Sequence, residues 1–256
     1  MKLLLLNGNT DEAITDRLAA AARGICAHEV VPATARFGAR YIATRAASAV
    51  AAHAVLDALA EHVGRDNPQG FDAAIIACFG DPGLEAAREM LPIPVLGLAD
   101  SSIRRAFAYR PDPFHDLSDD VPLHPLPTVS LLTGGAAWVP MLQEFAAPRT
   151  PFQAQLRVKA IEPTGDMIAR EPERALEMLA FAARVEREHG AHSVVLGGAG
   201  LVGLAPRLRE MAPKVRILDC LEETLADLPE VMAAPVAMQG APSVGLSPAL
   251  SRILAG

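Results

Sequence analysis

Short apolar runs alternate with longer amphipathic segments along most of this chain. The apolar runs predict strands at residues 3–6, 73–77, 93–98, 129–133, 194–196 and 215–218, and a further strand is expected at 155–161. Segments with helical periodicity lie between them, at about 11–23, 45–63, 138–146 and 171–189, and further helices start near 82 and 222. Apolar strands that alternate with helices are typical of parallel sheets covered on both faces.

The segment 109–127 interrupts this series, because it carries five prolines and no periodicity, and it predicts a connection. The stretches on either side of it are alike: "FDAAIIACFGDPGL" matches "AHSVVLGGAGLVGL", and "LLLLNGNT" matches "VSLLTGG". We therefore predict an α/β fold of two similar Rossmann-like parallel-sheet halves, related by a pseudo-twofold axis, with the site in the cleft between them.

The expected domain boundaries follow this repeat. Residues 1–110 form the first half, 111–127 form the Pro-rich connection, and 128–225 form the second half. The C-terminal segment, 226–256, is expected to pack back on the first half.

Composition and charge narrow the class of protein. The 256 residues are 51% hydrophobic and 21% charged, which supports a full core. The net charge is −7 and no basic stripe is present, so nucleic acid is not an expected partner. The opening "MKLLLLNGNT" has too short an apolar run for a signal peptide, and no run approaches the ~20 residues of a membrane span.

The three cysteines, Cys26, Cys78 and Cys220, are an odd number at wide spacing. This pattern predicts reduced thiols in a cytoplasmic protein and neither a disulfide framework nor a zinc site. The seven histidines show no metal-binding spacing, so no metal ligand is predicted, and the absence of GxSxG leaves a serine hydrolase unsupported.

Polar and small residues follow the first strand of each half. Asn7, Asn9 and Thr10 precede a helix, where their side chains and the helix N–H groups could hold a carboxylate or amide. Ordinary capping of that helix by Thr10 or Asp11 explains them equally well.

In the second half, Thr133 offers a hydroxyl, and Gly134 and Gly135 would let a ligand approach the backbone. A plain tight turn would need no ligand.

"GAGLVG", residues 198–203, matches GxGxxG after a strand, and Asp219 follows the next apolar run. A dinucleotide site is therefore an alternative, although a single GxGxxG is weak evidence and the helix before residue 215 is short. GxxxxGK[ST] is absent, which excludes a P-loop.

Cys78 ends an apolar strand just before the helix expected near Pro82. A helix N-terminus lowers the pKa of a thiol and can leave the sulfur accessible, so this position favours a reactive cysteine. Cys26 and Cys220 are interpreted as buried apolar residues.

Five stretches together resemble the aspartate/glutamate/hydantoin racemase superfamily, on its hydantoin (allantoin) racemase-like branch. They are "IACFGDPGLEAARE", "LNGNT", "LTGGAAWVPML", "VVLGGAGLVGLA" and "VGLSPALSRIL", which span almost the whole chain, and "ACFGDPGL" is the most particular. The resemblance implies a cofactor-independent racemase or epimerase with its site between two similar halves. In that family a cysteine from each half flanks the carbon that loses and regains a proton.

The chain departs from this pattern at the second cysteine, because the family's usual "LGC" reads Leu196-Gly197-Gly198 here. The resemblance thus implies that Cys78 is the catalytic acid/base and that its partner thiol is missing, with room at Gly198 for a water. The implied substrate-binding residues are Asn7, Asn9, Thr10, Phe79, Gly80, Thr133, Gly134, Gly135, Gly198 and Ala199.

Two alternatives remain open. One is a single-cysteine decarboxylase or isomerase of the same superfamily, since arylmalonate decarboxylase resembles the mirror arrangement, with its one cysteine in the second half. The other is a non-catalytic relative that binds a small molecule. In each case we expect a small-molecule ligand, no cofactor and a cytoplasmic homo-oligomer that binds neither membrane nor nucleic acid.

Overall fold

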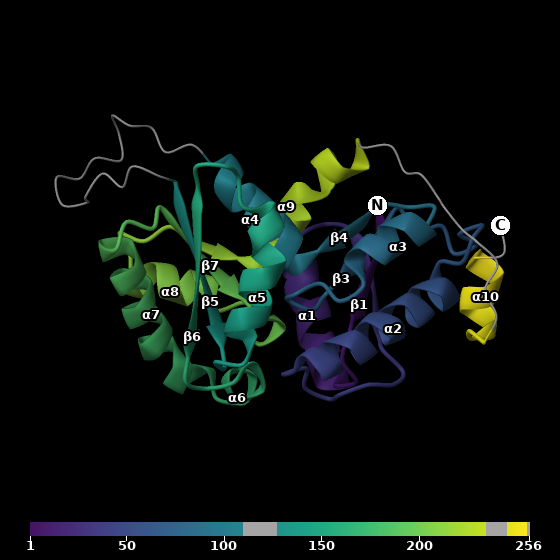
Figure 1. The fold of residues 1–256 in the computed structure, drawn as a ribbon, viewed down its shortest axis with the longest axis horizontal. Helices are drawn as coiled ribbons and strands as arrows, with labels where there is room; N and C mark the ends of the chain where they lie inside the picture. The colour runs from purple at the N-terminus through teal and green to yellow at the C-terminus, as the bar shows by residue number, and fades with distance from the viewer. Residues whose placement is uncertain (110–126, 234–244, 255–256) are drawn as a thin grey trace. The chain divides into compact units, whose positions relative to one another are not determined.

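The computed structural model describes residues 1–109, 127–233 and 245–254 of the chain. Of the connection expected at 111–127, all but the last residue lies outside the described residues. The chain forms two compact units, one of Met1–Leu98 with Thr224–Gly256 and one of Ala99–Glu223 (Figure 1). No helix among the described residues has the length and apolar character needed to cross a membrane.

The first unit contains a four-stranded sheet in the order β2-β1-β3-β4, with every neighbouring pair parallel. The second unit contains a sheet in the equivalent order, β6-β5-β7-β8, also parallel throughout. This confirms the predicted α/β class. The strands are β1 (Lys2–Asn7), β2 (Glu29–Thr34), β3 (Ala73–Ile76), β4 (Val95–Gly97), β5 (Thr128–Gly134), β6 (Gln155–Ile161), β7 (Ser193–Gly197) and β8 (Ile217–Asp219).

Helices connect successive strands in both units, as the periodicity predicts. They are α1 (Glu12–Ile25), α2 (Arg45–His62), α3 (Leu84–Met90), α4 (Leu98–Ala108), α5 (Trp138–Ala146), α6 (Gly165–Arg170), α7 (Pro172–Glu188), α8 (Ala205–Met211), α9 (Cys220–Met232) and α10 (Pro248–Leu254). Two short 3₁₀ turns complete the described elements, η1 (Ala147–Arg149) and η2 (Ala199–Leu201).

The clearest apolar runs in the sequence correspond to the central strands of the two sheets. The four leucines of β1 are each at most 1% exposed, because β1 pairs on both sides and is covered on both faces. The pattern missed β2, which lies at the edge of its sheet, is only partly buried and contains Pro32. Helix α1 continues through Gly24, the predicted stop, to Ile25.

The core of the second unit lies between its sheet and two helices. Leu176, Leu179 and Ala183 of α7 pack with Leu208 of α8 against apolar residues of β5, β7 and β8. In Figure 1, α7 and α8 lie on one side of these strands and α5 lies on the other.

Helix α4 belongs with the second unit although it directly follows β4. The Ser102 hydroxyl donates to the carbonyl of Cys220 (3.4 Å), and the Arg105 Nε donates to Glu223 Oε2 (2.8 Å). The two compact units therefore divide after Leu98, and the domain boundary at residue 110 stays a prediction. In the first unit, α10 packs on α2, and the Ser247 hydroxyl donates to Asp57 of α2.

Strand register gives a residue-by-residue correspondence between the two sheets. Leu6 pairs with Ile76 and Ile76 with Gly97. Leu132 pairs with Leu196, and Leu196 pairs with Asp219. Leu6 and Leu132 are equivalent, because they precede the similar pairs Asn7-Gly8 and Thr133-Gly134. Their partners Ile76 and Leu196 are then equivalent too, and so are Cys78 and Gly198, which lie two residues further on. By the same register, Gly97 is equivalent to Asp219.

A buried ion pair in the second unit gives a test of this core. Glu186 is 3% exposed and accepts hydrogen bonds from Ser130 Oγ and Arg157 Nε, both at 2.9 Å. We expect Arg157→Met to lower the free energy of unfolding by about 3–5 kcal/mol, because it leaves an uncompensated buried carboxylate. Urea denaturation measures this loss.

The matched control is Arg170→Met, since the Arg170 side chain is 70% exposed and pairs with Asp166 at the surface. That variant should lose about 0.5 kcal/mol or less. Equal losses in the two variants would contradict the importance assigned to burial.

Candidate functional site

The loop after β3 holds Cys78 at the carboxyl end of the first sheet. Its side chain is 7% exposed, and its carbonyl accepts a hydrogen bond from the backbone N–H of Asp81 (2.9 Å). Three loop positions have positive φ: Gly80 (φ +115°), Asp81 (φ +46°) and Gly83 (φ +80°). The loop therefore folds as a tight turn that keeps the thiol against the end of the sheet.

The prediction that the helix after Cys78 lowers the pKa of its thiol is wrong. Burial of the thiol, and after it the charge of Asp81, raise the pKa of Cys78 to about 12. Helix α3 begins only at Leu84, six residues further on, and has seven residues, so its N-terminus does not adjoin the sulfur. Cys78 is consequently a neutral thiol at neutral pH.

The loop after β1 packs directly beside Cys78. A Cβ added at Gly8 would lie 3.5 Å from Cys78 Cβ, 3.5 Å from Pro82 Cγ and 3.2 Å from Val55 Cγ2. The parallel pairing of β1 with β3 brings these two loops to one edge, as the strand order requires.

The asparagines of this loop bond to the loop itself. Asn7 Nδ2 contacts Asn9 Oδ1 (2.9 Å), Thr15 Oγ1 (3.0 Å) and the carbonyl of Asp11 (3.1 Å), while Asn7 Oδ1 accepts from the Asn9 N–H. Asp11 is the N-cap of α1 and accepts from the N–H of Ala13 (3.1 Å). The Asn7 side chain therefore holds the loop together rather than presenting its amide to a ligand.

The remaining predicted residues of the first unit lie beside these. Thr10 is half-buried, and its backbone N–H donates to the carbonyl of Ala39 (3.3 Å). Phe79 is buried and Gly80 is half-buried, within the turn after Cys78. The first unit thus brings Asn7, Asn9 and Cys78 to one sheet edge.

In the second unit, Thr133 and Gly197 are paired neighbours at the ends of β5 and β7. Thr133 is buried. The Gly135 N–H donates to the carbonyl of Ile161 (3.1 Å), so this N–H is already engaged at the edge of the sheet. A Cβ at Gly134 would clash with the backbone of Pro163 and Gly165, so glycine is required there by the approach of α6.

The loop after β7 is also built around glycine. Gly198 has φ +149°, a conformation that side chains rarely adopt, and a Cβ there would lie 3.1 Å from Leu201 Cδ1. A Cβ at Gly200 would clash with the carbonyl of Gly165. The start of α6 therefore lies against this loop, a neighbour that sequence reasoning missed because residues 163–168 carry no strong pattern.

The same loop argues against a dinucleotide site. Asp219, 1% exposed, accepts hydrogen bonds from the backbone N–H groups of Gly203 (2.9 Å), Leu221 (2.9 Å) and Glu222 (3.4 Å). Its carboxylate is thus engaged by backbone, where the fingerprint needs it on a ribose. The glycine turn leads into η2, and α8 has only seven residues.

The other two cysteines differ in their surroundings. Cys220 is buried at the start of α9, where its Sγ lies 4.0 Å from the carbonyl oxygen of Gly198. Cys26 is half-buried and follows α1. Proximity of Cys220 to Gly198 was not predicted, because the residues are 22 apart in sequence.

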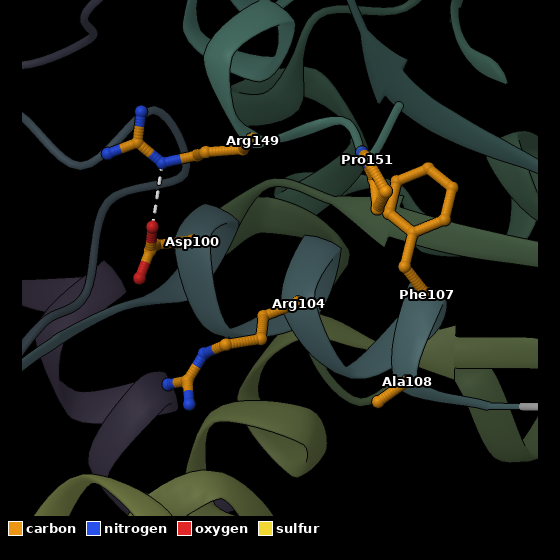
Figure 2. A pocket seen from close by; sticks show the side chains of 6 residues that line it. All are labelled: Asp100, Arg104, Phe107, Ala108, Arg149 and Pro151. Carbon is orange, nitrogen blue, oxygen red and sulfur yellow. Dashed lines mark hydrogen bonds and ion pairs between the residues drawn. The ribbon is translucent and has the colours of Figure 1, made fainter. Parts of the chain in front are cut away.

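A hollow of about 370 Å³ lies elsewhere in the second unit, and none of the predicted site residues lines it. Figure 2 shows Asp100 and Arg149 facing each other across their 2.6 Å hydrogen bond, with Phe107 and Pro151 on the opposite side. The Asp100 carboxylate is paired with Arg149, so this hollow offers no carboxylate suited to proton abstraction.

Comparisons with known proteins agree on one family. Residues 3–228 match the family described as Asp/Glu/Hydantoin racemase. A hydantoin racemase from Paenarthrobacter aurescens is 32% identical over 216 residues, which cover 82% of each chain.

Two solved structures are similar over nearly the whole chain. Allantoin racemase from Klebsiella pneumoniae has a TM-score of 0.75 at 25% identity, covering 98% of this chain and 93% of the other. Allantoin racemase from Pseudomonas fluorescens has a TM-score of 0.76 at 23% identity, covering 98% and 96%.

The glycine-specific backbone at 198 gives a stability test. We expect Gly198→Ala to lower the free energy of unfolding by about 1–3 kcal/mol, because alanine disfavours φ near +149°. The matched control is Gly24→Ala inside α1, where a Cβ meets nothing within 4 Å. It should stabilise by about 0.5–1 kcal/mol. Urea denaturation of both variants decides, and a neutral Gly198→Ala would contradict the assigned strain.

Proposed function

The chain belongs to the Asp/Glu/Hydantoin racemase family, and on this basis we propose that it racemises or epimerises hydantoin-like or amino-acid-derived substrates without a cofactor. The observation that carries this proposal is the Cys78 thiol at the carboxyl end of β3, in a loop that packs against Gly8 of the loop after β1. The reaction is removal and return of a proton at a carbon next to a carbonyl.

In the proposed reaction, the thiolate of Cys78 takes the proton from the substrate carbon and becomes a thiol. The electron pair moves onto the neighbouring carbonyl oxygen, and a donor there stabilises the developing negative charge. We assign that donor to the Thr133 hydroxyl. The Gly135 N–H is a weaker candidate than its sequence position suggests, because it already donates to Ile161.

Inversion requires a second proton donor on the opposite face of the substrate. Gly198 occupies the position equivalent to Cys78 and has no side chain, so we propose that a water returns the proton there and becomes hydroxide. The proton on the Cys78 thiol then passes to that hydroxide through solvent, which restores water and the thiolate. The carbon-bound proton of a hydantoin is acidified by its neighbouring carbonyl, which gives the intermediate time to meet such a donor.

A second candidate is a single-cysteine decarboxylase, and the neutral state of the thiol favours it. A thiol with a pKa of about 12 is ready to donate a proton and cannot accept one without first ionising. In that reaction the substrate's carbon–carboxylate bond breaks, carbon dioxide leaves, and Cys78 protonates the resulting enediolate at carbon.

The deciding experiment follows a chiral 5-substituted hydantoin in D2O, by optical rotation and by mass spectrometry of the deuterium at C5. Deuterium gain with loss of rotation supports the racemase. Deuterium gain with retained rotation indicates a one-face site. Neither change, together with carbon dioxide release from an arylmalonate, would replace the racemase by the decarboxylase. Saturable binding without either reaction would indicate a non-catalytic relative.

The role of Cys78 is tested by Cys78→Ser. A hydroxyl ionises far less readily than a thiol, so the rate of exchange should fall by about 10²–10⁴-fold. Cys26→Ala is the control and should keep its rate, because Cys26 lies after α1 and outside the Cys78 loop. An active Cys78→Ser enzyme would refute the assignment, provided that thermal unfolding shows both variants folded.

The role of Thr133 is tested by Thr133→Val, which preserves shape and removes the hydroxyl. Loss of a donor to a buried polar group costs about 1–3 kcal/mol, so kcat/KM should fall by roughly 5–150-fold. Unchanged kinetics in the folded variant would move the oxyanion-binding group to another residue.

A further inference from the structure

We propose that Asp81 is a positioning residue for the proton on Cys78: its buried carboxylate, fixed against the last residue of β4, acts together with the burial of the thiol to hold the proton on the sulfur. Its meaning for catalysis rests on the proposed function, whereas its test needs no substrate. Three features of the first unit carry this inference.

The first feature is the backbone that places Asp81. Its N–H donates to the Cys78 carbonyl (2.9 Å), and its own carbonyl accepts from the N–H of Leu84 (3.1 Å). Asp81 has φ +46°, which is uncommon for a residue other than glycine. These two hydrogen bonds fix the shape of the turn, and Asp81 follows Cys78 by three residues within it.

The second feature is the position of the carboxylate itself. Asp81 is 3% exposed, and a Cβ added at Gly97 would clash with both carboxylate oxygens and the carbon between them. The carboxylate thus occupies the space beside Gly97 that a side chain would otherwise fill. It lies at the end of β4, the strand that pairs directly with β3, which leads to Cys78.

The third feature is a difference between the two units. Gly97 is equivalent to Asp219, and the loop position equivalent to Asp81 is Leu201. Each unit therefore has a buried carboxylate at the end of its fourth strand. In the second unit the strand carries it, whereas in the first unit the loop carries it, and that is the loop with the thiol. The buried carboxylate therefore lies in the same loop as the thiol in the first unit, whereas the equivalent loop of the second unit has neither group.

The surroundings of Cys78 make this charge effective. A Cβ added at Gly8 would meet Cys78 Cβ, Val55 Cγ2 and Pro82 Cγ, so the β1 loop packs beside Cys78 with apolar atoms and no charged group among these contacts. Among the described residues, Asp81 is the ionisable group whose charge acts on Cys78, and with burial it raises the pKa of the thiol to about 12. In such apolar surroundings a nearby negative charge is only weakly screened.

Two consequences follow for the resting protein. The thiol is neutral near neutral pH and so resists alkylation and oxidation, which require the thiolate. As a base in racemisation, Cys78 becomes more available as pH rises, and burial together with the Asp81 charge sets the pH range in which the thiolate forms.

The test compares wild type with Asp81→Asn by the pH dependence of Cys78 alkylation with iodoacetamide, read on the Cys78 peptide by mass spectrometry. Asparagine has the shape of aspartate and also tolerates left-handed backbone, so the turn is retained. Loss of the charge should lower the pKa of Cys78 and raise its alkylation rate at about pH 9 by tenfold or more, since one pKa unit is a tenfold change in thiolate. Cys26 serves as the internal reference.

Asp66→Asn, which removes an exposed carboxylate in the same unit, is the matched control and should leave the Cys78 titration unchanged. Because burial can limit access of the reagent, the ultraviolet absorbance of the thiolate, taken as the difference from Cys78→Ser in each background, provides a second titration. Coincident titrations of wild type and Asp81→Asn by both methods would overturn the inference, even in an active racemase. A lowered pKa in Asp81→Asn supports it, even if no racemase activity is found.

Discussion

Parallel pairing of apolar strands is the constraint on which the remaining features of this protein depend. A parallel strand must return over its sheet through a helix, so both faces become covered and polar side chains find room mainly at the strand ends. In the first unit this places the loops after β1 and β3 in contact, with Gly8 against Cys78 and Pro82. In the second unit it pairs Thr133 with Gly197 and places Gly198 one residue further on.

Each unit has a buried carboxylate at the end of its fourth strand. Burial raises the pKa of Asp219, while hydrogen bonds from the N–H groups of Gly203, Leu221 and Glu222 oppose that rise. Asp219 thereby ties the loop after β7 to the start of α9. Asp81 also sits at the end of the fourth strand of its unit, but its position three residues from Cys78 adds an electrostatic effect on the thiol.

The glycine at position 198 lacks the expected thiol and also permits a backbone conformation that other residues rarely adopt. Its backbone lies at φ +149°, and Gly200 and Gly134 nearby admit no Cβ because the residues at the start of α6 approach them closely. The second unit is therefore built around the absence of side chains at these points. Chemistry that needs a second proton donor must then use water or a group from outside this loop, which is why a one-thiol reaction remains the second candidate.

The sequence by itself determined the α/β class, the central strands and most of the helices, because burial of β1, β3, β5 and β7 imposes continuous apolar runs that can be read locally. Helix α5 was predicted with the bounds it has, Trp138–Ala146. The edge strand β2 was missed, because partial burial and Pro32 weaken its pattern. The motif "ACFGDPGL" and its counterpart at 196–198 also indicated the family and the missing thiol.

Only the tertiary structure decided what surrounds these residues. The sequence places Cys78 near a helix, from which a lowered pKa was expected, but burial and the Asp81 charge act in the opposite direction. The contacts of Asp81 with Gly97, of Gly200 with Gly165, and of Cys220 with Gly198 join residues from different loops and strands. Electrostatics and close packing depend on distances in space between such residues, and no local pattern in the sequence encodes those distances.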